Sequence, residues 1–479
     1  MITAMPSDAT QQGAGTNYNL TYVWMISLVA AMGGLLFGYD WVVIGGAKPF
    51  YEPFFGLIGD AQAWRAGWAM SSALAGCLAG ALLSGALSDR LGRKRLLVGA
   101  ALLFTVSAVW TALSNTYEAF IWARILGGIG IGLASNVSPM YIAESSPAEM
   151  RGRFVSINQL TIVIGVLAAQ LVNLLIYNLA PVAPDASPEV LLASWNGQSG
   201  WRWMFAAEAV PAGLFLLLAL VIPESPRWLL KQGRTAEAEH VLAHIGGAAY
   251  AQREILDVQA TLKGEHGTVR FAELLQPKLL KLVALGAFLA IFQQWCGINV
   301  IFNYAEEIFR AAGYDVSGMM FNIVITGLVN LAFTFVAIRT VDRWGRRPLM
   351  LLGAGGLTLT YAVLGACYYM ELKGVAVLAV VLTAIAIYAM TLAPITWVLL
   401  AEIFPNRIRG AAMSLCVSSL WVACFALTAT FKPINAALGA AGTFWLYGAI
   451  CLAGFAVLWR GVPETKGKSL EQIERELAD

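Results

Sequence analysis

Long apolar stretches alternate with short polar segments along the whole chain. Twelve of them are long enough to cross a bilayer, which takes roughly 20 helical residues. Backbone groups in lipid must be hydrogen-bonded within the protein, and barrel strands would be about half as long, so these stretches predict helices. The expected fold is therefore an all-α membrane protein, with spans near residues 22–46, 64–87, 96–113, 120–142, 154–177, 201–222, 280–309, 318–340, 349–369, 375–400, 411–431 and 441–459.

The composition supports this interpretation. Charged residues make up 13% of 479 residues and the mean hydropathy is +0.68, whereas soluble domains carry about 25% charged residues. These values exclude a soluble enzyme, a nucleic-acid binder and a disordered scaffold. The six cysteines lie in apolar stretches without metal-binding spacing, so we interpret them as small buried apolar residues. The sequence contains no nucleotide loop or nucleophile elbow, and we expect neither enzyme activity nor a cofactor.

Lysine and arginine gather in the loops on one side. With both termini on that side, 24 of the 31 basic residues lie there, 6 lie on the other side, and Arg124 lies within a span. Because cytoplasmic loops carry the excess of basic residues, we expect both termini in the cytoplasm. The polar segment 1–19 lacks the features of a cleaved signal peptide. We expect a multi-pass protein of a bacterial inner membrane with its first span retained.

Three motifs occur twice, at matching places in the two halves of the chain. This repetition predicts two six-helix bundles, residues 1–222 and 277–479, joined by a charged helical linker, 223–276. Parallel repeats of this kind place a substrate site at their interface near mid-membrane. The repeated motifs are Asp89–Arg95 with Asp342–Pro348, Glu144/Pro147/Arg151/Gly152 with Glu402/Pro405/Arg409/Gly410, and Pro223–Ser225 with Pro463–Thr465.

Together with Gly200–Phe205 and Gln293–Asn299, these motifs match a known family. The sequence resembles the sugar-porter family of the major facilitator superfamily, and especially bacterial proton-coupled xylose and glucose symporters, from about Gly34 to Ile473. The resemblance implies the twelve-helix major facilitator fold and alternating-access transport of a hexose or pentose with a proton. Val166 and Leu420 replace glutamines of the xylose-symporter pattern and Asn303 replaces a tyrosine, which leaves the particular sugar open.

Three charged residues inside the expected spans need explaining: Asp40, Arg124 and Glu208. A charge at the bilayer centre costs about 2.5–3.5 kcal/mol on insertion scales, so each needs a reason to be there. Asp40 is late in the first span and Arg124 early in the antiparallel fourth span, which brings them to a similar depth. The resemblance makes Asp40 the proton carrier and Arg124 its modulator. The alternative is a purely structural ion pair, and Glu208 is open between coupling and structural bonding.

A sugar site needs uncharged hydrogen-bonding groups and flat apolar faces. Asparagine and glutamine side chains both donate and accept hydrogen bonds, and indole rings pack against the C–H faces of a sugar. The alternative is that such amides join neighbouring helices. The candidates, which the resemblance matches to sugar contacts of the family, are Gln159, Gln293, Gln294, Asn299, Asn330 and Trp397, with Phe37 and Trp421 as wall residues.

The charged motifs on the cytoplasmic side predict a latch that closes the inner end and favours an outward-facing state. Single exposed ion pairs contribute little, so a latch requires a network. The general excess of basic residues in cytoplasmic loops would explain the arginines of these motifs, but it would not explain the glutamates that recur at fixed spacing. The expected members are Arg90, Arg93, Glu144, Arg151, Glu224 and Arg227 in the first half and Arg343, Arg346, Glu402 and Arg409 in the second.

Other features fit simpler roles. Gly76/Gly80 and Gly128/Gly132 predict close helix packing, and His240 with His244 is interpreted as a solvated helix face rather than a metal site. The expected partners are a monosaccharide, a proton and the lipid bilayer, without nucleic acid, and the expected state is a monomer. A uniporter of the same fold is the first rival, which Asp40 argues against. A sugar sensor is disfavoured by the short C-terminal segment Arg460–Asp479.

Overall fold

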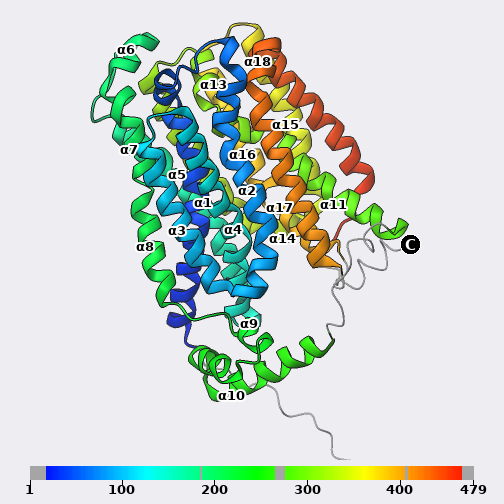
Figure 1. The fold of residues 1–479 in the computed structure, drawn as a ribbon. Helices are drawn as coiled ribbons and strands as arrows, with labels where there is room; N and C mark the ends of the chain where they lie inside the picture. The colour runs from blue at the N-terminus through cyan, green and yellow to red at the C-terminus, as the bar shows by residue number, and fades with distance from the viewer. Residues whose placement is uncertain (1–17, 184–185, 265–275, 405–407, 467–479) are drawn as a thin grey trace, which may run out of the picture.

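The computed structural model describes residues 18–183, 186–264, 276–404 and 408–466, and within these ranges the regular structure is helical throughout (Figure 1). Both ends of the chain, and with them the expected position of the termini, lie outside the described residues. The first half forms a bundle of packed helices. They are α1 (Leu20–Phe54), η1 (Asp60–Gln62), α2 (Ala63–Leu91), α3 (Arg93–Leu113), α4 (Tyr117–Ser145), η2 (Ala148–Met150), α5 (Arg151–Tyr177), α6 (Pro188–Ala193), η3 (Asn196–Gly200), α7 (Trp201–Ala206) and α8 (Ala209–Val221).

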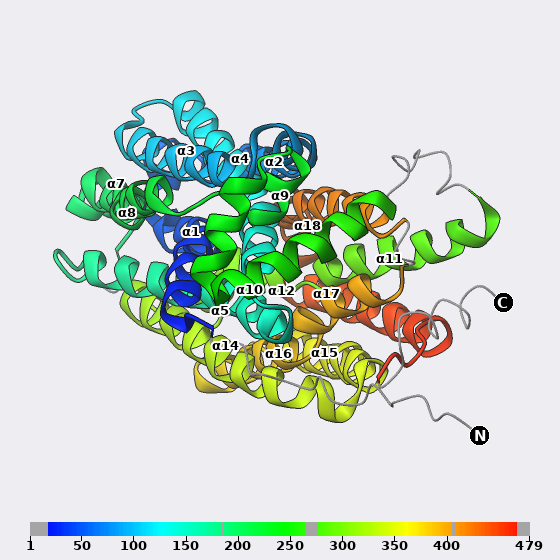
Figure 2. The same ribbon diagram turned by 90° about the horizontal axis from the view of Figure 1, so that it is seen from below.

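The linker docks against one end of the first bundle. It contains α9 (Pro226–Lys231) and α10 (Thr235–Gly264), and α10 is kinked at Gly246 and Gly247. The indole Nε1 of Trp228 donates to the carbonyl of Asp89 at 3.0 Å, which fixes α9 to the end of α2. Figure 2 shows α9 and α10 crossing this end of the molecule, which we call the linker end. The opposite end is called the far end.

The second half forms a similar bundle with more interrupted helices. The seventh apolar stretch is broken at Gly297, which has a φ of 85°, and at Tyr304, so it is divided into α11, α12 and α13. The tenth is broken at Thr391 between α16 and α17. The helices are α11 (Pro277–Trp295), α12 (Ile298–Asn303), α13 (Ala305–Ala311), α14 (Val316–Trp344), α15 (Arg346–Tyr369), α16 (Val375–Met390), α17 (Leu392–Glu402) and α18 (Arg409–Gly461).

The described residues include 11 helices long and apolar enough to cross a membrane. The last of them, α18, has 53 residues, about 80 Å at 1.5 Å per residue, whereas the hydrocarbon core is about 30 Å thick. Gly439 within α18 has a φ of 68°, so the helix is two passes merged across a kink. The predicted all-α fold with twelve spans is confirmed.

Small residues allow the closest helix contact in the first bundle. A Cβ atom on Gly128 of α4 would lie 1.9 Å from the carbonyl oxygen of Ala73, and one on Gly76 of α2 would lie 2.1 Å from that of Ile125. Neither position can hold a larger residue without separating the two backbones. The predicted packing role of these glycines is confirmed.

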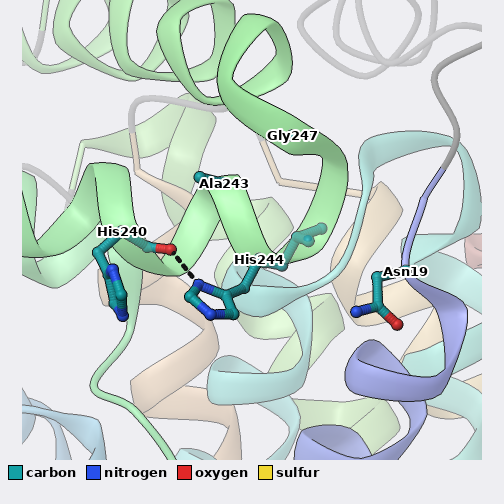
Figure 3. Close-up of a pocket in the computed structure, with 6 residues that line it drawn as sticks. Asn19, His240, Ala243, His244 and Gly247 are labelled. Atoms are coloured by element: carbon teal, nitrogen blue, oxygen red, sulfur yellow. Dashed lines mark hydrogen bonds between the residues drawn. The ribbon is translucent and has the colours of Figure 1, made fainter.

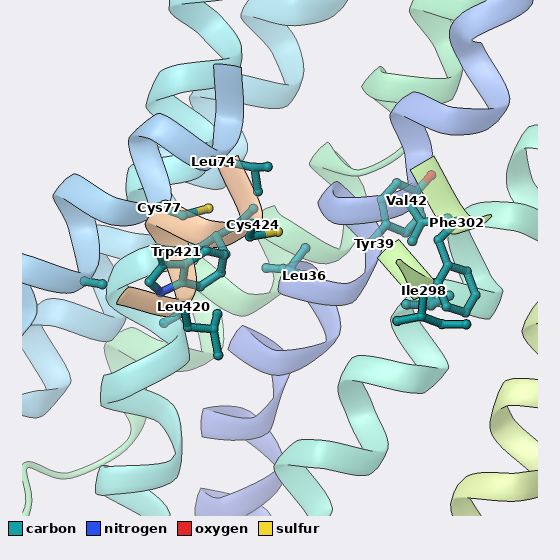
Figure 4. Packing of buried hydrophobic residues seen from close by; sticks show 14 of the residues in the cluster. Leu36, Tyr39, Val42, Leu74, Cys77, Ile298, Phe302, Leu420, Trp421 and Cys424 are labelled. Atoms are coloured by element: carbon teal, nitrogen blue, oxygen red, sulfur yellow. The ribbon is translucent and has the colours of Figure 1, made fainter. Parts of the chain in front are cut away.

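The two bundles meet along α1. Figure 4 shows Leu420, Trp421 and Cys424 of α18 beside Leu74 and Cys77 of α2, with Leu36 of α1 close by. Elsewhere along α1, Ile298 and Phe302 of α12 lie near Tyr39 and Val42 (Figure 4). Helix α2 packs on α18 and α5 packs on α14. The sequence-based prediction of a substrate site at this interface stays a prediction.

Candidate functional site

Asp40 on α1 and Arg124 on α4 form a buried ion pair. Asp40 is 1% exposed and Arg124 is 2% exposed. The Nη1 atom of Arg124 donates to Asp40 Oδ1, and Nη2 donates to the backbone carbonyl of Asp40 at 3.1 Å. A Cβ atom on Gly127 would lie 2.9 Å from Asp40 Oδ2, so the glycine leaves room for the carboxylate. Among the described residues Asp40 Oδ2 has no hydrogen-bond partner.

Glu208 joins this group through Phe205. The Arg124 guanidinium lies 5.3 Å from the centre of the Phe205 ring. Glu208 is also buried, and its backbone N–H donates to the Phe205 carbonyl at 3.2 Å. The break between α7 and α8 places Glu208 here, and its Oε1 has no partner within the described ranges. The structure thus brings all three charged residues to one region of the first bundle.

Three amides form a chain of hydrogen bonds in the second bundle. Asn299 Nδ2 donates to Gln294 Oε1, and Gln294 Nε2 donates to Gln293 Oε1 at 3.1 Å. Gln293 Nε2 then donates to the carbonyl of Ala393 at 3.3 Å, at the start of α17. The turn at Gly297 folds Asn299 back toward α11 and makes this chain possible. All three side chains are buried, so the chain joins the broken seventh and tenth spans.

An aromatic cluster, Phe37, Trp41 and Trp421, joins the two bundles. Phe37 and Trp41 lie one turn apart on α1, with ring centres 5.9 Å apart. Trp421 of α18 lies 5.9 Å from Phe37 and 6.0 Å from Trp41. Cys424, one turn beyond Trp421, lies 3.8 Å from Asn299 Nδ2, which connects the aromatic cluster to the amide chain. Trp41 was not among the sequence-based candidates, although its spacing of four from Phe37 places it on the same helix face.

The other sugar-site candidates lie on neighbouring helices. Gln159 on α5 and Asn330 on α14 are half-buried, and Trp397 on α17 is 38% exposed. No hydrogen bond joins these side chains to the amide chain among the described residues. Asn303, at the end of α12, is buried, and its Oδ1 has no hydrogen-bond partner among the described residues. Hydrogen bonds thus join Gln293, Gln294 and Asn299 directly. Within the described residues they do not extend to Gln159, Asn330 or Trp397.

At the linker end of the first bundle, Glu144 binds two of the repeated motifs. Arg93 contacts it through Nε, at 2.9 Å from Oε2, and through Nη2, at 2.9 Å from Oε1. The Ser225 hydroxyl donates to Glu144 Oε2. Glu224 accepts the backbone N–H groups of Arg93 and Lys94 at 2.9 and 3.0 Å, at the start of α3. A carboxylate is favoured at a helix N-terminus.

The second bundle repeats this arrangement. Arg346 Nη2 lies 3.0 Å from Glu402 Oε1, and the Thr465 hydroxyl donates to Glu402 Oε2 at 2.6 Å. Glu464 accepts the N–H groups of Arg346 and Arg347 at 3.0 and 3.1 Å. Partial burial raises the pKa of Glu464, but these N–H groups and that of Lys466 outweigh it and hold the pKa below its ordinary value. Ser225 and Thr465 were missed as partners, although their motifs were recognised as a repeat.

These contacts lie within each bundle or join the first bundle to the linker, and none of them crosses from one bundle to the other. Of the remaining predicted latch residues, Arg90, Arg227 and Arg343 are exposed. Arg151 Nε donates to the backbone carbonyl of Ala143 at 2.9 Å. The Arg409 side chain lies outside the described residues. Closure of the inner end by the latch stays a prediction.

His240 and His244 lie exposed on α10, where Asn19 at the start of α1 meets the linker (Figure 3). His244 Nδ1 lies 2.8 Å from the carbonyl oxygen of His240, and the Asn19 N–H donates to the carbonyl of Ile245 at 2.8 Å. The described residues contain no group of three or more potential metal ligands. The contacts here tie the linker to α1.

The fold and these sites together define a membrane protein made of two repeated helical bundles with buried ionisable and amide groups between and within them. A family model described as "Sugar (and other) transporter" matches residues 26–477. The chain belongs to this family, the sugar porters of the major facilitator superfamily.

Individual relatives cover nearly the whole chain. It is 38% identical to the D-xylose-proton symporter of Escherichia coli (strain K12), with 96% of each protein covered. It is 36% identical to the arabinose-proton symporter of Bacillus subtilis (strain 168), again with 96% of each covered. A solved structure of the E. coli xylose transporter, in a partially occluded inward-open conformation, gives a TM-score of 0.82 at 37% identity over 94% of this chain and 100% of that one.

Proposed function

We propose that this protein is a proton-coupled monosaccharide symporter that works by alternating access. The observation that carries the proposal is Asp40, a buried carboxylate with one oxygen bonded to Arg124 and the other without a partner in the described structure. The relatives named as xylose-proton and arabinose-proton symporters support the same function. Hexose and pentose substrates are both compatible with the site.

The proton pathway is assigned to Asp40, Arg124 and Glu208. Asp40 carries the proton, because its free oxygen can be protonated without breaking the contact between Oδ1 and Arg124. Arg124 tunes Asp40, and Glu208 is the neighbouring group through which the proton can pass. A membrane potential of 100 mV supplies about 2.3 kcal/mol per proton. At about 1.4 kcal/mol per factor of ten, this supports roughly 40-fold accumulation.

The sugar site is assigned to the interface between the bundles. The amide chain Gln293–Gln294–Asn299 supplies donors and acceptors to the sugar hydroxyls, and Phe37 with Trp421 supplies apolar walls. Gln159, Asn330 and Trp397 complete the site from α5, α14 and α17 when the bundles close around a sugar. Amides and indoles of this kind suit a hydroxylated neutral ligand better than a lipophilic cation.

The remaining proposals concern architecture and placement. The bundles are residues 1–222 and 277–479, and 223–276 is the linker between them. The protein acts as a monomer in the lipid bilayer of a bacterial inner membrane. Both termini and the linker end face the cytoplasm, because the basic loops gather there. The repeated Arg–Glu groups form the latch that closes this inner end.

Uptake into proteoliposomes tests the proposal. Wild-type protein should accumulate sugar when an inward proton gradient is imposed and lose the accumulation when the gradient is collapsed. The Asp40→Asn variant should lose accumulation but keep sugar counterflow, because the site remains and the proton carrier is gone. Accumulation that ignores the proton gradient would favour the uniporter, and counterflow absent with every sugar in a competition panel would favour a sensor.

A further inference from the structure

A cluster of six charged residues joins the two bundles at the far end. We call it the far-end cluster: Lys48 and Glu52 of α1, Glu306, Glu307 and Arg310 of α13, and Lys432 of α18. Three members are acidic and three are basic, so the cluster is neutral overall. None of them belongs to the proton or sugar sites assigned above.

Lys48 is the centre of the cluster and is 1% exposed. Its Nζ lies 2.7 Å from Glu306 Oε2, and it also contacts Glu307 Oε1. The same ammonium lies 5.4 Å from the centre of the Tyr304 ring. A buried ammonium is stable only when paired, so Lys48 depends on α13 of the other bundle.

A second contact crosses between the bundles beside the first. Lys432 Nζ lies 2.8 Å from both carboxylate oxygens of Glu52 and 3.8 Å from Glu307 Oε1. Arg310 Nη2 holds Glu306 from within α13, at 2.6 Å from Oε1. Each bundle therefore supplies a lysine to the other. Lys48 of the first bundle contacts α13, and Lys432 of the second bundle contacts α1. Separation of the bundles at this end must break both.

The surroundings of the cluster favour reversible separation. A cavity of about 270 Å³ at the far end is lined by Glu52, Glu306, Glu307, Arg310 and Lys432, so water can reach the charges as they part. Helix α13 has seven residues and is set off from α11 by the breaks at Gly297 and Tyr304. A short helix bounded by two breaks can tilt without unfolding the span. A permanent clamp would need neither feature.

We propose that the far-end cluster is the outer gate of the transport cycle, in which Lys48 and Lys432 hold the far end closed and release α13 each time the site opens to that side. The inference rests on the proposed transport function. It assigns a charged gate on the side opposite the predicted latch. Removal of Lys48 leaves three glutamates with only Arg310 and Lys432 to neutralise them among the described residues, and it removes the cation of the first bundle that contacts α13, which favours the open far end.

Electron–electron distance measurements test the gate directly. Spin labels at Trp64→Cys and Leu438→Cys, two exposed far-end positions on α2 and α18, report the separation of the bundles. Lys48→Gln should enlarge the fraction of long distances several-fold, and the charge swap Lys48→Glu with Glu306→Lys should restore the wild-type distribution. Arg65→Gln is the matched control, because Arg65 is a far-end cation whose contacts with Gln62 and Tyr117 stay within the first bundle. Unchanged distances in folded Lys48→Gln protein would overturn the proposal.

A reversible cross-link distinguishes the gate from a permanent clamp. A cleavable thiol-reactive cross-linker that spans Glu52→Cys and Lys432→Cys should reduce uptake at least tenfold, and its cleavage should restore the rate seen before cross-linking. Undiminished uptake with the cross-link fully formed would refute the gate. The distance measurement needs neither a proton gradient nor a known sugar. A failed symport assay with a responsive gate would therefore refute the proposed function alone.

Discussion

The Asp40–Arg124 pair gives the sharpest energetic prediction, because each charge is buried and depends on the other. Removing one partner of a buried pair typically destabilises a protein by about 3–5 kcal/mol, since the remaining charge is left uncompensated. Replacing both by neutral groups is often close to neutral. We therefore expect Asp40→Asn and Arg124→Gln each to lower the free energy of unfolding by about 3 kcal/mol. The double variant should lose about 3–4 kcal/mol, compared with a sum of about 6 kcal/mol for the two single variants.

Equilibrium unfolding in mixed detergent micelles measures these three variants and the wild type as a double-mutant cycle. The carbonyl of Asp40 still accepts from Arg124 Nη2 in the Asp40→Asn variant, so this single change should be the milder one. A coupling energy of about 2–3 kcal/mol is expected, near the upper end for residues in contact. Additive effects, with a coupling energy below about 0.5 kcal/mol, would show that the pair is not an energetic unit. Glu144→Gln is a suitable control at a different ion pair.

Three further changes test other contacts. Trp41→Ala should let bulkier sugars compete for uptake, because its indole occupies space beside Trp421 in the proposed sugar site. Trp68→Ala is the control: it removes a different ring contact between the bundles, with Phe425, and should not change which sugars compete. Asn299→Ala should lower the free energy of unfolding by about 1–3 kcal/mol in the equilibrium assay, since it leaves the buried Gln294 Oε1 without its hydrogen-bond donor. Glu464→Gln should lower thermal stability at pH 7, and the difference should shrink as the pH falls below the ordinary glutamate pKa, because a depressed carboxylate pKa stabilises the fold above the ordinary pKa and the contribution is lost as the pH falls through the folded value. A stability difference that does not shrink as the pH is lowered would contradict this assignment.

Much of the fold could be predicted because membrane spans leave a strong one-dimensional signal. A helix in lipid needs a continuous apolar stretch, so the spans near 22–46 and 318–340 could be predicted without knowledge of their neighbours, and they lie within α1 (Leu20–Phe54) and α14 (Val316–Trp344). The breaks at Tyr304 and Thr391 were not predicted, because hydropathy averages over a window and is unchanged by one non-helical residue. These breaks decide where Asn299 and α13 lie. The overall architecture was therefore easier to predict than the geometry of its functional helices.

For a related reason, some of the functional residues could be predicted from the sequence and others could not. Asp40 and Arg124 stood out because charges in apolar stretches are rare. Lys48 and Lys432 were counted with the basic residues outside the spans, where charge is ordinary and carries no signal of its own, and Glu306, near the end of the expected span 280–309, was not singled out. Only the three-dimensional arrangement reveals that they pair across the bundles. Trp41 was missed because an aromatic residue in a span is usually packing.

The two ends of the molecule use charge in different ways. At the linker end, Arg93 with Glu144 and Arg346 with Glu402 pair inside their own bundles, in the same arrangement twice. Duplication explains this, because each half inherited the same internal contacts. At the far end, Lys48 with Glu306 and Lys432 with Glu52 pair between bundles and have no repeated counterpart in the sequence. A contact between bundles is made and broken by their relative motion, whereas one inside a bundle moves with it. If the far-end cluster is the proposed outer gate, the charges that control opening most directly are those that the internal repeat does not contain.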